Sequence, residues 1–411
     1  MTRVTEALRL LVLLAGALWS GACGAFADGA GEPAQSVFTD PRAEQWALGE
    51  APRLQIGGTD ERDGYALGHV VGAVLLRDRL IIADRTFSEV RSYSLSGELL
   101  SRSGRKGHGP GEFRALSSLA SYDDSTVVAW DVALRRLTLL TPNGEVRATF
   151  SANLAGALSL SPDFVGVLDG GRFVFRDERP DISLKGEPAG ERRDSIEYLI
   201  LEPDGSWDGL MLKEPGEEVF FYRDGNGTWG TAPVIFGRAT LEAIAGASLV
   251  IGTNDTLRLE RVSGDGSIRH TATLPWVPTP VTSECVELER QRLLEEEFDR
   301  NRLLLAHLSP SGDARLSAWL REQNRLLPSR RTLPAFSALR ADALGNIWVA
   351  EYAAPGSKAR TWAVLDSLFS PVARIEVPSH IEILDLDASD LVGLTEDELG
   401  RETVALYPII R

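Results

Sequence analysis

The sequence has few of the residues that cross-link small folds or form local metal motifs. It contains two cysteines and five histidines among 411 residues, which excludes a framework of several disulfides. The histidines are scattered singly, and neither H-E-x-x-H nor C-x-x-C occurs, so no local zinc motif is present. G-x-S-x-G is also absent, which excludes a nucleophile elbow.

Positive charge is also in short supply. The net charge is −16, and an acidic surface repels phosphate backbones. Arg330 and Arg331 form only a pair of cations and do not extend into a basic patch. We therefore expect no nucleic-acid partner. We expect the chain to act as a monomer.

The one long hydrophobic run lies at the N-terminus. Arg3 and Arg9 precede Leu10–Trp19, which is too short to span a bilayer comfortably and is typical of an export signal. Two processing sites compete. Ala25–Ala27 matches an A-x-A cleavage site, whereas Ser20–Cys23 resembles a lipobox in which Cys23 would carry a lipid.

Both processing sites predict an exported protein. It would be periplasmic or secreted, without a transmembrane segment after signal removal, and lipid-anchored in the cell envelope if Cys23 is modified. We assign residues 1–27 to the signal peptide and residues 28–42 to a disordered linker.

What the sequence has in quantity is a repeated pattern of short strands. RLIIADRTFSEVRSYSLSGELLSRSG and STVVAWDVALRRLTLLTPNGEVRATF share one order: an apolar strand, an Asp, an alternating strand, a Gly turn and another strand. Asp84 matches Asp131, and Gly97 matches Gly144 at the same spacing. Apolar and polar residues alternate at period two, which predicts β-strands. Asn-Gly and Asp-Gly pairs predict hairpins with primed turns.

Six such copies follow one another along the chain. Units of about 40 to 60 residues, each forming a four-stranded sheet, are the signature of a β-propeller. No single blade can bury both of its faces, so the blades pack against one another. We therefore predict an all-β fold, a six-bladed β-propeller over residues 43–411. The sixth copy is short of a strand, and Ala43–Gly58 alternates as a strand. This N-terminal strand is predicted to complete the last blade and close the ring.

A helical insertion interrupts the pattern before the fifth copy, over residues 283–327. Apolar residues recur at helical spacing, Ser283 is placed to cap the first helix, and Ser309–Gly312 is expected to end it. Asp313 is expected to cap a second helix that ends before Pro328. The insertion is either a lid or docking surface, or a helical hairpin that only buries its leucines.

The Gly-rich stretch SRSGRKGHGPGEF, residues 101–113, invites comparison with a phosphate loop. It lacks G-x-x-x-x-G-K-[ST], and no helix follows that could hold a phosphate at its N-terminus. The stretch is instead expected to carry the chain from the rim of blade one to the axis of blade two, with Phe113 between the blades. A binding surface would involve Arg105, His108 and Glu112, and Arg105 is placed to pair with Glu112.

The motifs GRKGHGPGEF, LPAFSALRADALGNIWVAEY and TEDELGRETVALYPI carry a family resemblance. Together they resemble a broad bacterial family of exported six-bladed β-propellers with NHL-like blades, most of unassigned function. The resemblance covers most of the chain from about Gly58 onward. It implies the fold and export, and it brings no catalytic residues.

Acids or amides recur where the second strand of each copy ends. Equivalent positions in successive blades form a ring around the axis, and several oxygens are what Ca²⁺ requires. A calcium ion there could polarise an ester carbonyl and acidify water. The alternative is that each side chain accepts N–H groups of its own turn. The candidate metal ligands are Asp84, Asp131, Asp177, Asp255 and Glu351.

Two functions remain open. The first is a non-catalytic extracytoplasmic protein that binds a small molecule or another protein at the propeller face, without a cofactor and without catalytic residues. The second is a calcium-dependent hydrolase or lactonase with an axial metal site. The orientation of the strand-end acids discriminates between them.

Overall fold

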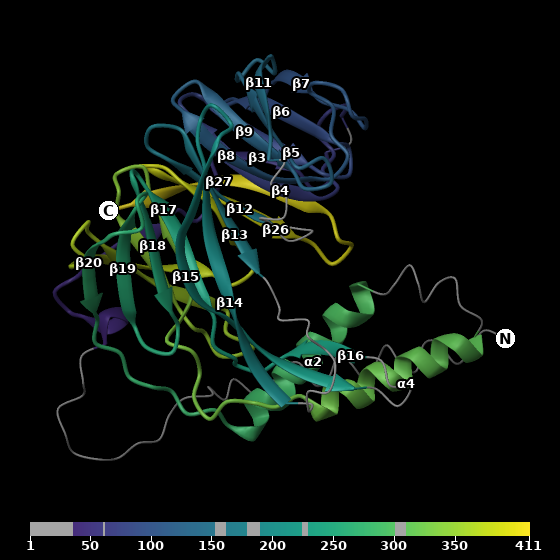
Figure 1. Ribbon diagram of the computed structural model, residues 1–411, viewed down its shortest axis with the longest axis vertical. Coiled ribbons are helices and arrows are strands. Elements are labelled where there is room, and N and C mark those ends of the chain that lie inside the picture. The colour runs from purple at the N-terminus through teal and green to yellow at the C-terminus, as the bar shows by residue number, and fades with distance from the viewer. Residues whose placement is uncertain (1–35, 61, 153–161, 179–189, 224–228, 301–309) are drawn as a thin grey trace.

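The computed structural model describes residues 36–60, 62–152, 162–178, 190–223, 229–300 and 310–411. Cys23 and the predicted signal peptide lie outside these residues. The described chain consists mainly of antiparallel sheets arranged around a common centre, with two helices at one end (Figure 1).

The first three sheets follow one another along the chain. Each runs from an innermost strand to an outer strand by antiparallel neighbours. Sheet 1 contains β4 (Val70–Leu76), β5 (Arg79–Asp84), β6 (Glu89–Ser94) and β7 (Leu99–Ser103). Sheet 2 contains β8 (Leu116–Asp123), β9 (Thr126–Asp131), β10 (Arg136–Leu140) and β11 (Val146–Ser151). Sheet 3 contains β12 (Asp163–Leu168), β13 (Arg172–Glu178), β14 (Gly190–Leu201), β15 (Trp207–Arg223) and β16 (Trp229–Pro233).

The last three sheets repeat this order, and two of them gain strands from the N-terminal segment. Sheet 4 contains β17 (Thr240–Ala245), β18 (Ser248–Thr253), β19 (Arg258–Ser263) and β20 (Ile268–Thr273). Sheet 5 contains β21 (Phe336–Ala341), β22 (Ile347–Glu351), β23 (Ala359–Leu365), β24 (Pro371–Pro378) and the parallel β1 (Glu44–Gln45). Sheet 6 contains β25 (Glu382–Leu386), β26 (Asp390–Glu396), β27 (Glu402–Ile410), β2 (Ala47–Leu48) and β3 (Leu54–Gly57).

The innermost strands form a closed ring. Each of β4, β8, β12, β17, β21 and β25 contacts the next, and β25 contacts β4 again. The ring is completed at the chain ends, where β3 pairs antiparallel with β27, as the repeat pattern predicts. The arrangement is propeller-like, because each sheet covers the face of its neighbour.

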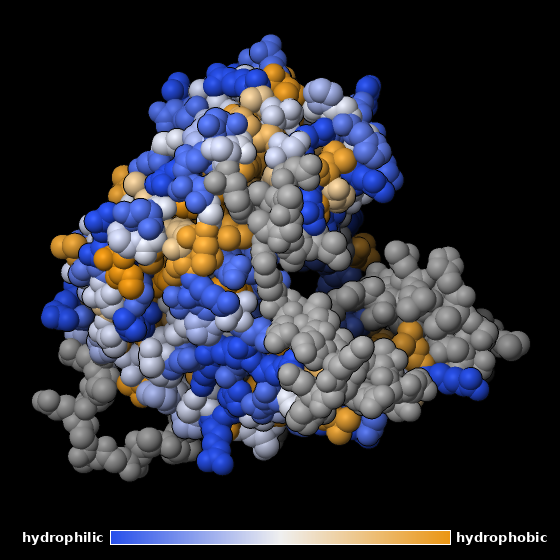
Figure 2. All heavy atoms as spheres, in the orientation of Figure 1, coloured by the Kyte–Doolittle hydropathy of each residue, from blue (hydrophilic) through white to orange (hydrophobic). Residues whose placement is uncertain are grey.

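Aromatic and aliphatic side chains fill the spaces between sheets. Phe113 is fully buried with residues of sheets 1 and 2, which confirms its predicted position. Trp130 packs against Phe175 between sheets 2 and 3, with ring centroids 5.0 Å apart. On the face shown in Figure 2, hydrophilic residues predominate among the coloured residues and hydrophobic ones form scattered groups.

The hairpins turn differently from the prediction. Gly97, Gly144 and Gly266 have φ of 87°, 84° and 79°, whereas Asn143 and Asp265 do not have positive φ. A primed turn of type I′ needs positive φ at both central residues. Here the glycine N–H closes the turn by donating to the carbonyl three residues earlier, as Gly144 does to Thr141 at 2.8 Å. The positive φ therefore belongs to the turn's last residue, where only glycine fits without strain.

Two helices lie between β20 and β21: α2 (Ser283–Arg300) and α4 (Pro310–Leu326). Two predicted caps are wrong. The Oγ1 atom of Thr282, and not Ser283, accepts the Cys285 N–H at 3.2 Å. Pro310 opens α4, in keeping with the preference of proline for a first turn, so Asp313 lies inside α4 and does not cap its start. No helix of the described residues is long and apolar enough to cross a bilayer.

Packed structure begins earlier than predicted, within the assigned linker 28–42. Val37–Thr39 form a 3₁₀ turn, and Val37 and Phe38 are buried against sheets 4 and 5. Asp40 holds Arg42 through two hydrogen bonds to its side chain. Apolar burial therefore anchors residues 36–42, and a disordered linker does not extend through them.

Candidate ligand-binding face

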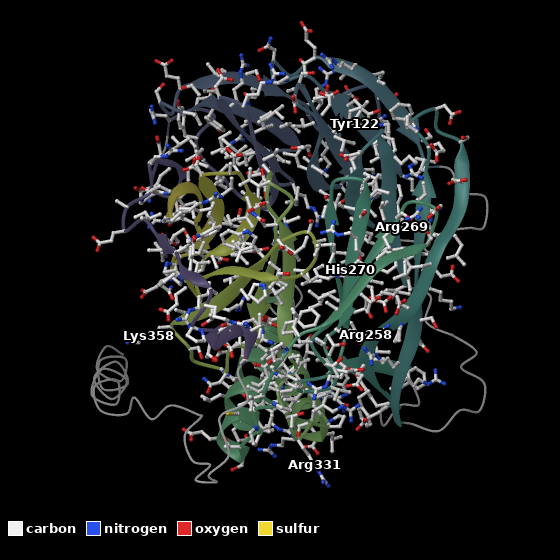
Figure 3. All side chains as sticks on the ribbon, turned by 90° about the vertical axis from the view of Figure 1, so that its left-hand side faces the viewer. Tyr122, Arg258, Arg269, His270, Arg331 and Lys358 are labelled. Carbon is white, nitrogen blue, oxygen red and sulfur yellow. The ribbon has the colours of Figure 1, made fainter. Side chains whose placement is uncertain are left out.

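One end of the sheets carries most of the predicted functional residues. There the innermost strands begin, the second strands end, and α2 and α4 precede β21. We call this end the helix-bearing face. Figure 3 shows Arg331 beside the helices at this end of the molecule, far from Tyr122.

Two of the strand-end acids cap loops. The carboxylate of Asp84 is fully buried and accepts the N–H groups of Gly68, at 2.8 Å, and Phe87, at 3.2 Å. Asp131 is also fully buried, and it accepts the N–H groups of Arg114 (2.5 Å), Ala115 (3.1 Å) and Leu134 (2.9 Å). Each carboxylate thus joins the turn after its own strand to the segment entering the same sheet.

In sheet 4 the amide beside the predicted acid performs this task. Asn254 accepts the Ala239 N–H at 2.8 Å and donates to the Phe336 carbonyl at 3.2 Å. Asp255 is instead part-exposed, and its carboxylate lies 2.9 Å from a terminal nitrogen of Arg193. The structure therefore does not bring Asp255 together with Asp84 and Asp131 as equivalent groups.

Asp177 and Glu351 complete the predicted set. Asp177 is fully buried at the end of β13. Burial raises the pKa of Glu351, and a hydrogen bond with Thr361 partly offsets this rise. Among the residues that the structure describes, no three His, Cys, Asp or Glu side chains form a group suited to a metal ion. The calcium site stays a prediction.

The Gly-rich loop satisfies its own polar groups. The Glu112 carboxylate accepts the N–H groups of His108 (3.0 Å) and Gly109 (2.8 Å), and it pairs with Arg105 at 2.6 Å. These bonds hold the pKa of Glu112 below its usual range. A Cβ on Gly107 would lie 2.1 Å from this carboxylate, so the loop closes tightly on itself. The three predicted binding residues thus lie together in one closed loop.

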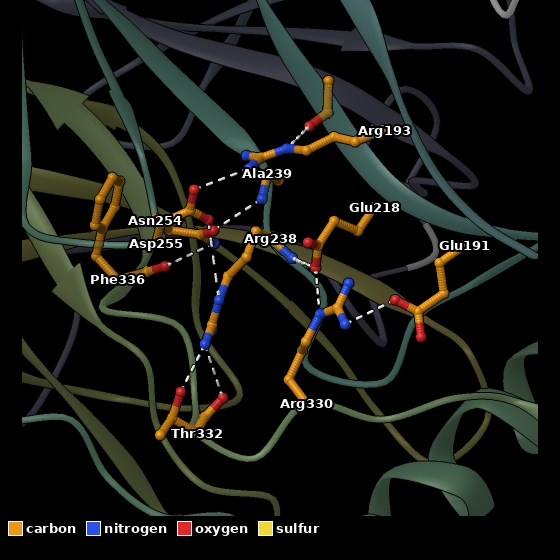
Figure 4. A network of polar contacts seen from close by, with 11 residues as sticks. Glu191, Arg193, Glu218, Arg238, Ala239, Asn254, Asp255, Arg330, Thr332 and Phe336 are labelled. Atoms are coloured by element: carbon orange, nitrogen blue, oxygen red, sulfur yellow. Dashed lines mark hydrogen bonds and ion pairs between the residues drawn. The ribbon is translucent and has the colours of Figure 1, made fainter.

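A network of arginines and acids occupies the same face between sheets 3, 4 and 5 (Figure 4). Arg330 follows α4 and bridges two acids, with its nitrogens 2.7 Å from both Glu218 and Glu191. Arg238 precedes β17 and donates to the Thr332 side chain at 2.7 Å. Arg193 on β14 donates to the Gly216 carbonyl at 2.9 Å and pairs with Asp255.

This network contains surplus hydrogen-bond donors. One terminal nitrogen of Arg193 and one of Arg238 are buried without a hydrogen-bond partner among the described residues. Burial lowers the pKa of Arg238, and the nearby Arg330 and Arg193 lower it further, against the opposing effect of Asp255 and Glu218. Buried N–H groups normally find an acceptor, so the network has room for oxygen atoms from water or a ligand.

Two acids on the inner strands β17 and β25 have shifted pKa values. The Tyr198 hydroxyl donates to Glu242 on the inner strand β17 at 2.7 Å, and burial raises the pKa of Glu242. On β25, burial raises the pKa of Asp385 to about 6, although its carboxylate accepts the Leu75 N–H at 2.9 Å. Glu242 and Asp385 therefore resist ionisation.

Sequence reasoning missed Arg193, Arg238 and Glu218. They come from β14, the loop before β17, and β15, so no local motif joins them. Arg330 was noted only as one of a pair of cations. Its proximity to Glu191 and Glu218 depends on the length of the β14–β15 hairpin, which reaches toward α2 and α4 (Figure 1).

Comparisons with known proteins give likenesses of shape. A protein of Bacteroides fragilis whose name describes it as exported is 12% identical, with a TM-score of 0.44, covering 87% of this chain and 94% of that one. A DUF4221 member from Bacteroides vulgatus is 10% identical, with a TM-score of 0.47, covering 90% and 99%. A virginiamycin B lyase from Staphylococcus aureus is 11% identical, with a TM-score of 0.39, covering 87% and 99%.

No family model matches the chain, and no curated protein matches it by sequence. The order of the sheets and the contacts of their inner strands define the fold without these likenesses.

Proposed function

We propose that this protein is a non-catalytic, extracytoplasmic six-bladed β-propeller that binds a small molecule or another protein. Each of the six sheets is one blade, and α2 and α4 form an insertion before the fifth. Export is inferred from the N-terminal signal and from the family resemblance. The helix-bearing face is the binding face, with the chain acting as a monomer.

One contrast carries this proposal. On the helix-bearing face, Asp84 and Asp131 accept backbone N–H groups. Arg193 and Arg238 instead have buried N–H groups with no partner in the part of the chain that the structure describes. A carboxylate that already accepts two or three backbone N–H groups has fewer lone pairs left for a metal ion. Unsatisfied guanidinium donors favour a ligand that brings oxygen acceptors.

The test is thermal unfolding of the purified protein with a panel of small oxygen-rich ligands. A ligand at a hundred times its dissociation constant should stabilise the folded protein by about 2.7 kcal/mol. Arg238→Gln should abolish that stabilisation. Arg261→Gln is the matched control, because Arg261 also has buried unpaired nitrogens but lies on β19, outside the network. Hydrolysis of an ester or lactone substrate by the wild-type protein would overturn the non-catalytic assignment.

A calcium-dependent hydrolase is the second candidate, because acids recur at equivalent strand ends in sheets 1, 2, 3 and 5. Its ligands would be Asp84, Asp131, Asp177, Asp255 and Glu351. Unfolding in EGTA and then in about 1 mM Ca²⁺ separates the candidates, since a site with a dissociation constant near 10 μM would add about 2.7 kcal/mol. An unchanged unfolding midpoint would exclude a calcium site of that affinity.

A further inference from the structure

A pocket lies between α2 and sheet 5 on the helix-bearing face. Its volume is about 350 Å³, within the range of small-molecule sites. Glu289 and Arg292 of α2 line one side. Tyr352, the loop 353–357 and Arg360 on β23 line the other side, together with Ser337 and Ser379.

On the α2 side of the pocket, two carboxylates share one arginine. The Arg292 guanidinium contacts both oxygens of Glu289, at 2.9 Å and 2.6 Å, and Glu289 is buried. Arg292 also pairs with Glu296, one turn further along the helix. This wall therefore offers no free positive charge, and the Glu289 carboxylate opposes multiply charged anions.

The sheet side carries an uncompensated cation. Arg360 is part-buried, and among the described residues no carboxylate forms an ion pair with it. The Nε atom of Arg360 is buried and has no hydrogen-bond partner among the residues described, and burial lowers the pKa of this guanidinium. A guanidinium withdrawn from water without a counter-ion costs free energy that a bound anion would recover.

Tyr352 adds an uncharged donor beside this cation. Its ring meets Phe236 edge-on, with centroids 6.1 Å apart at 85°. Burial raises the pKa of Tyr352 to about 12, so its hydroxyl keeps its proton at neutral pH and can donate a hydrogen bond. Ala353, Ala354 and Pro355 continue the wall with apolar surface.

We propose that this pocket binds a small monocarboxylic acid with an apolar body. Arg360 would pair with the carboxylate, Tyr352 would donate to it, and Ala353–Pro355 would contact the apolar part. A single negative charge fits, because Arg360 is one cation and the two carboxylates around Arg292 give the facing wall a surplus negative charge that repels a second one. This inference goes beyond the proposed function, because the pocket lies on the same face but its lining does not include Arg193 or Arg238.

Benzoate is a suitable probe, with benzamide as its uncharged counterpart and inorganic phosphate as a competing oxyanion. Binding to the purified protein is measured by isothermal titration calorimetry. We expect benzoate to bind at least tenfold more tightly than benzamide, and more tightly than phosphate. Equal affinity for benzoate and benzamide would overturn the proposal, and tighter binding of phosphate would overturn the choice of a monocarboxylate.

Variants then locate the site. Arg360→Gln should weaken benzoate binding at least tenfold, Arg360→Lys should retain part of it, and Tyr352→Phe should weaken it a few-fold. Arg261→Gln is the control and should leave binding unchanged. Unaltered benzoate binding by a folded Arg360→Gln protein would exclude this pocket. The proposed function is tested separately, by the effect of Arg238→Gln on the panel of oxygen-rich ligands, so a failure of the pocket assignment leaves it standing.

Discussion

The Gly-rich loop and the Arg360 pocket both contain arginine and glutamate, but these charged groups are paired to different extents. In the loop, Glu112 is shared among Arg105 and two backbone N–H groups. In the pocket, Arg292 takes the available carboxylate, Glu289, and Arg360 keeps a buried nitrogen unpaired. The loop is conspicuous in the sequence but internally satisfied, whereas the pocket has no sequence signature but has unmet polar groups.

The largest predicted effect tests whether the loop is structural. Phe113→Ala should destabilise the protein by about 3–5 kcal/mol, because a fully buried ring between two sheets is replaced by a cavity. Denaturant unfolding measures the loss. Leu100→Ala is the control, since Leu100 is 45% exposed and should change stability little. A loss as small as the control's would mean that the loop is not anchored by this ring.

The second largest effect on stability is expected from an acid that caps a loop, compared with an exposed acid. Asp131→Ala leaves three backbone N–H groups without their acceptor and should cost about 3 kcal/mol. Asp255→Ala removes a part-exposed ion pair with Arg193 and should cost less than about 1 kcal/mol. Chemical denaturation compares the two. Equal losses would contradict the distinction between capping and surface acids.

Asp385 extends the comparison to a half-buried acid whose pKa is raised by burial. Its pKa is raised from 3.8 to about 6, so the folded state holds the proton more tightly than the unfolded state. The free energy of unfolding should therefore fall as pH rises from about 4 to about 6. The full shift corresponds to about 3 kcal/mol, and partial solvent contact reduces this figure.

Asn cannot ionise and still offers an oxygen to the Leu75 N–H. Asp385→Asn should thus stabilise the protein by about 1–2 kcal/mol above pH 7 and have little effect near pH 3. Unfolding curves at both pH values check this. A variant less stable than the wild-type protein at pH 8 would show that the ionised carboxylate is needed.

The smallest effect is expected at the rim of the loop. The Arg105 side chain is 80% exposed, so Arg105→Ala should shift the unfolding midpoint by less than about 2 °C. It should not alter benzoate binding. A clear loss of benzoate binding in this variant would show that the Gly-rich loop contributes to the binding site.

Much of the architecture could be predicted from the sequence, because short-range patterns encode it. The match of Asp84 with Asp131 predicted equivalent strand ends, and the alternation in Ala43–Gly58 predicted a strand, of which β3 pairs with β27. Turn geometry was less readable. Gly144 has positive φ but Asn143 does not, since an Asn-Gly pair is compatible with more than one type of turn.

The candidate site could not be predicted from the sequence for the most part, because its residues come from segments that are far apart in the chain. Arg193, Arg238 and Arg330 come from three separate segments, and nothing around any of them marks it. The strand-end acids were visible, but their orientation toward loop N–H groups follows from tertiary contacts. Asn254, and not Asp255, serves as the cap in sheet 4, and the two residues are adjacent in the sequence.

Sequence alone determined the repeated sheets, the pairing of the two chain ends and the presence of two helices before β21. Periodicity and glycine turns are local, so they act before the chain is folded. Tertiary structure alone decided which charges are satisfied. Whether an arginine or a carboxylate finds a partner depends on burial and on atoms from distant segments, and this is why Arg360 became visible as a candidate only in the folded protein.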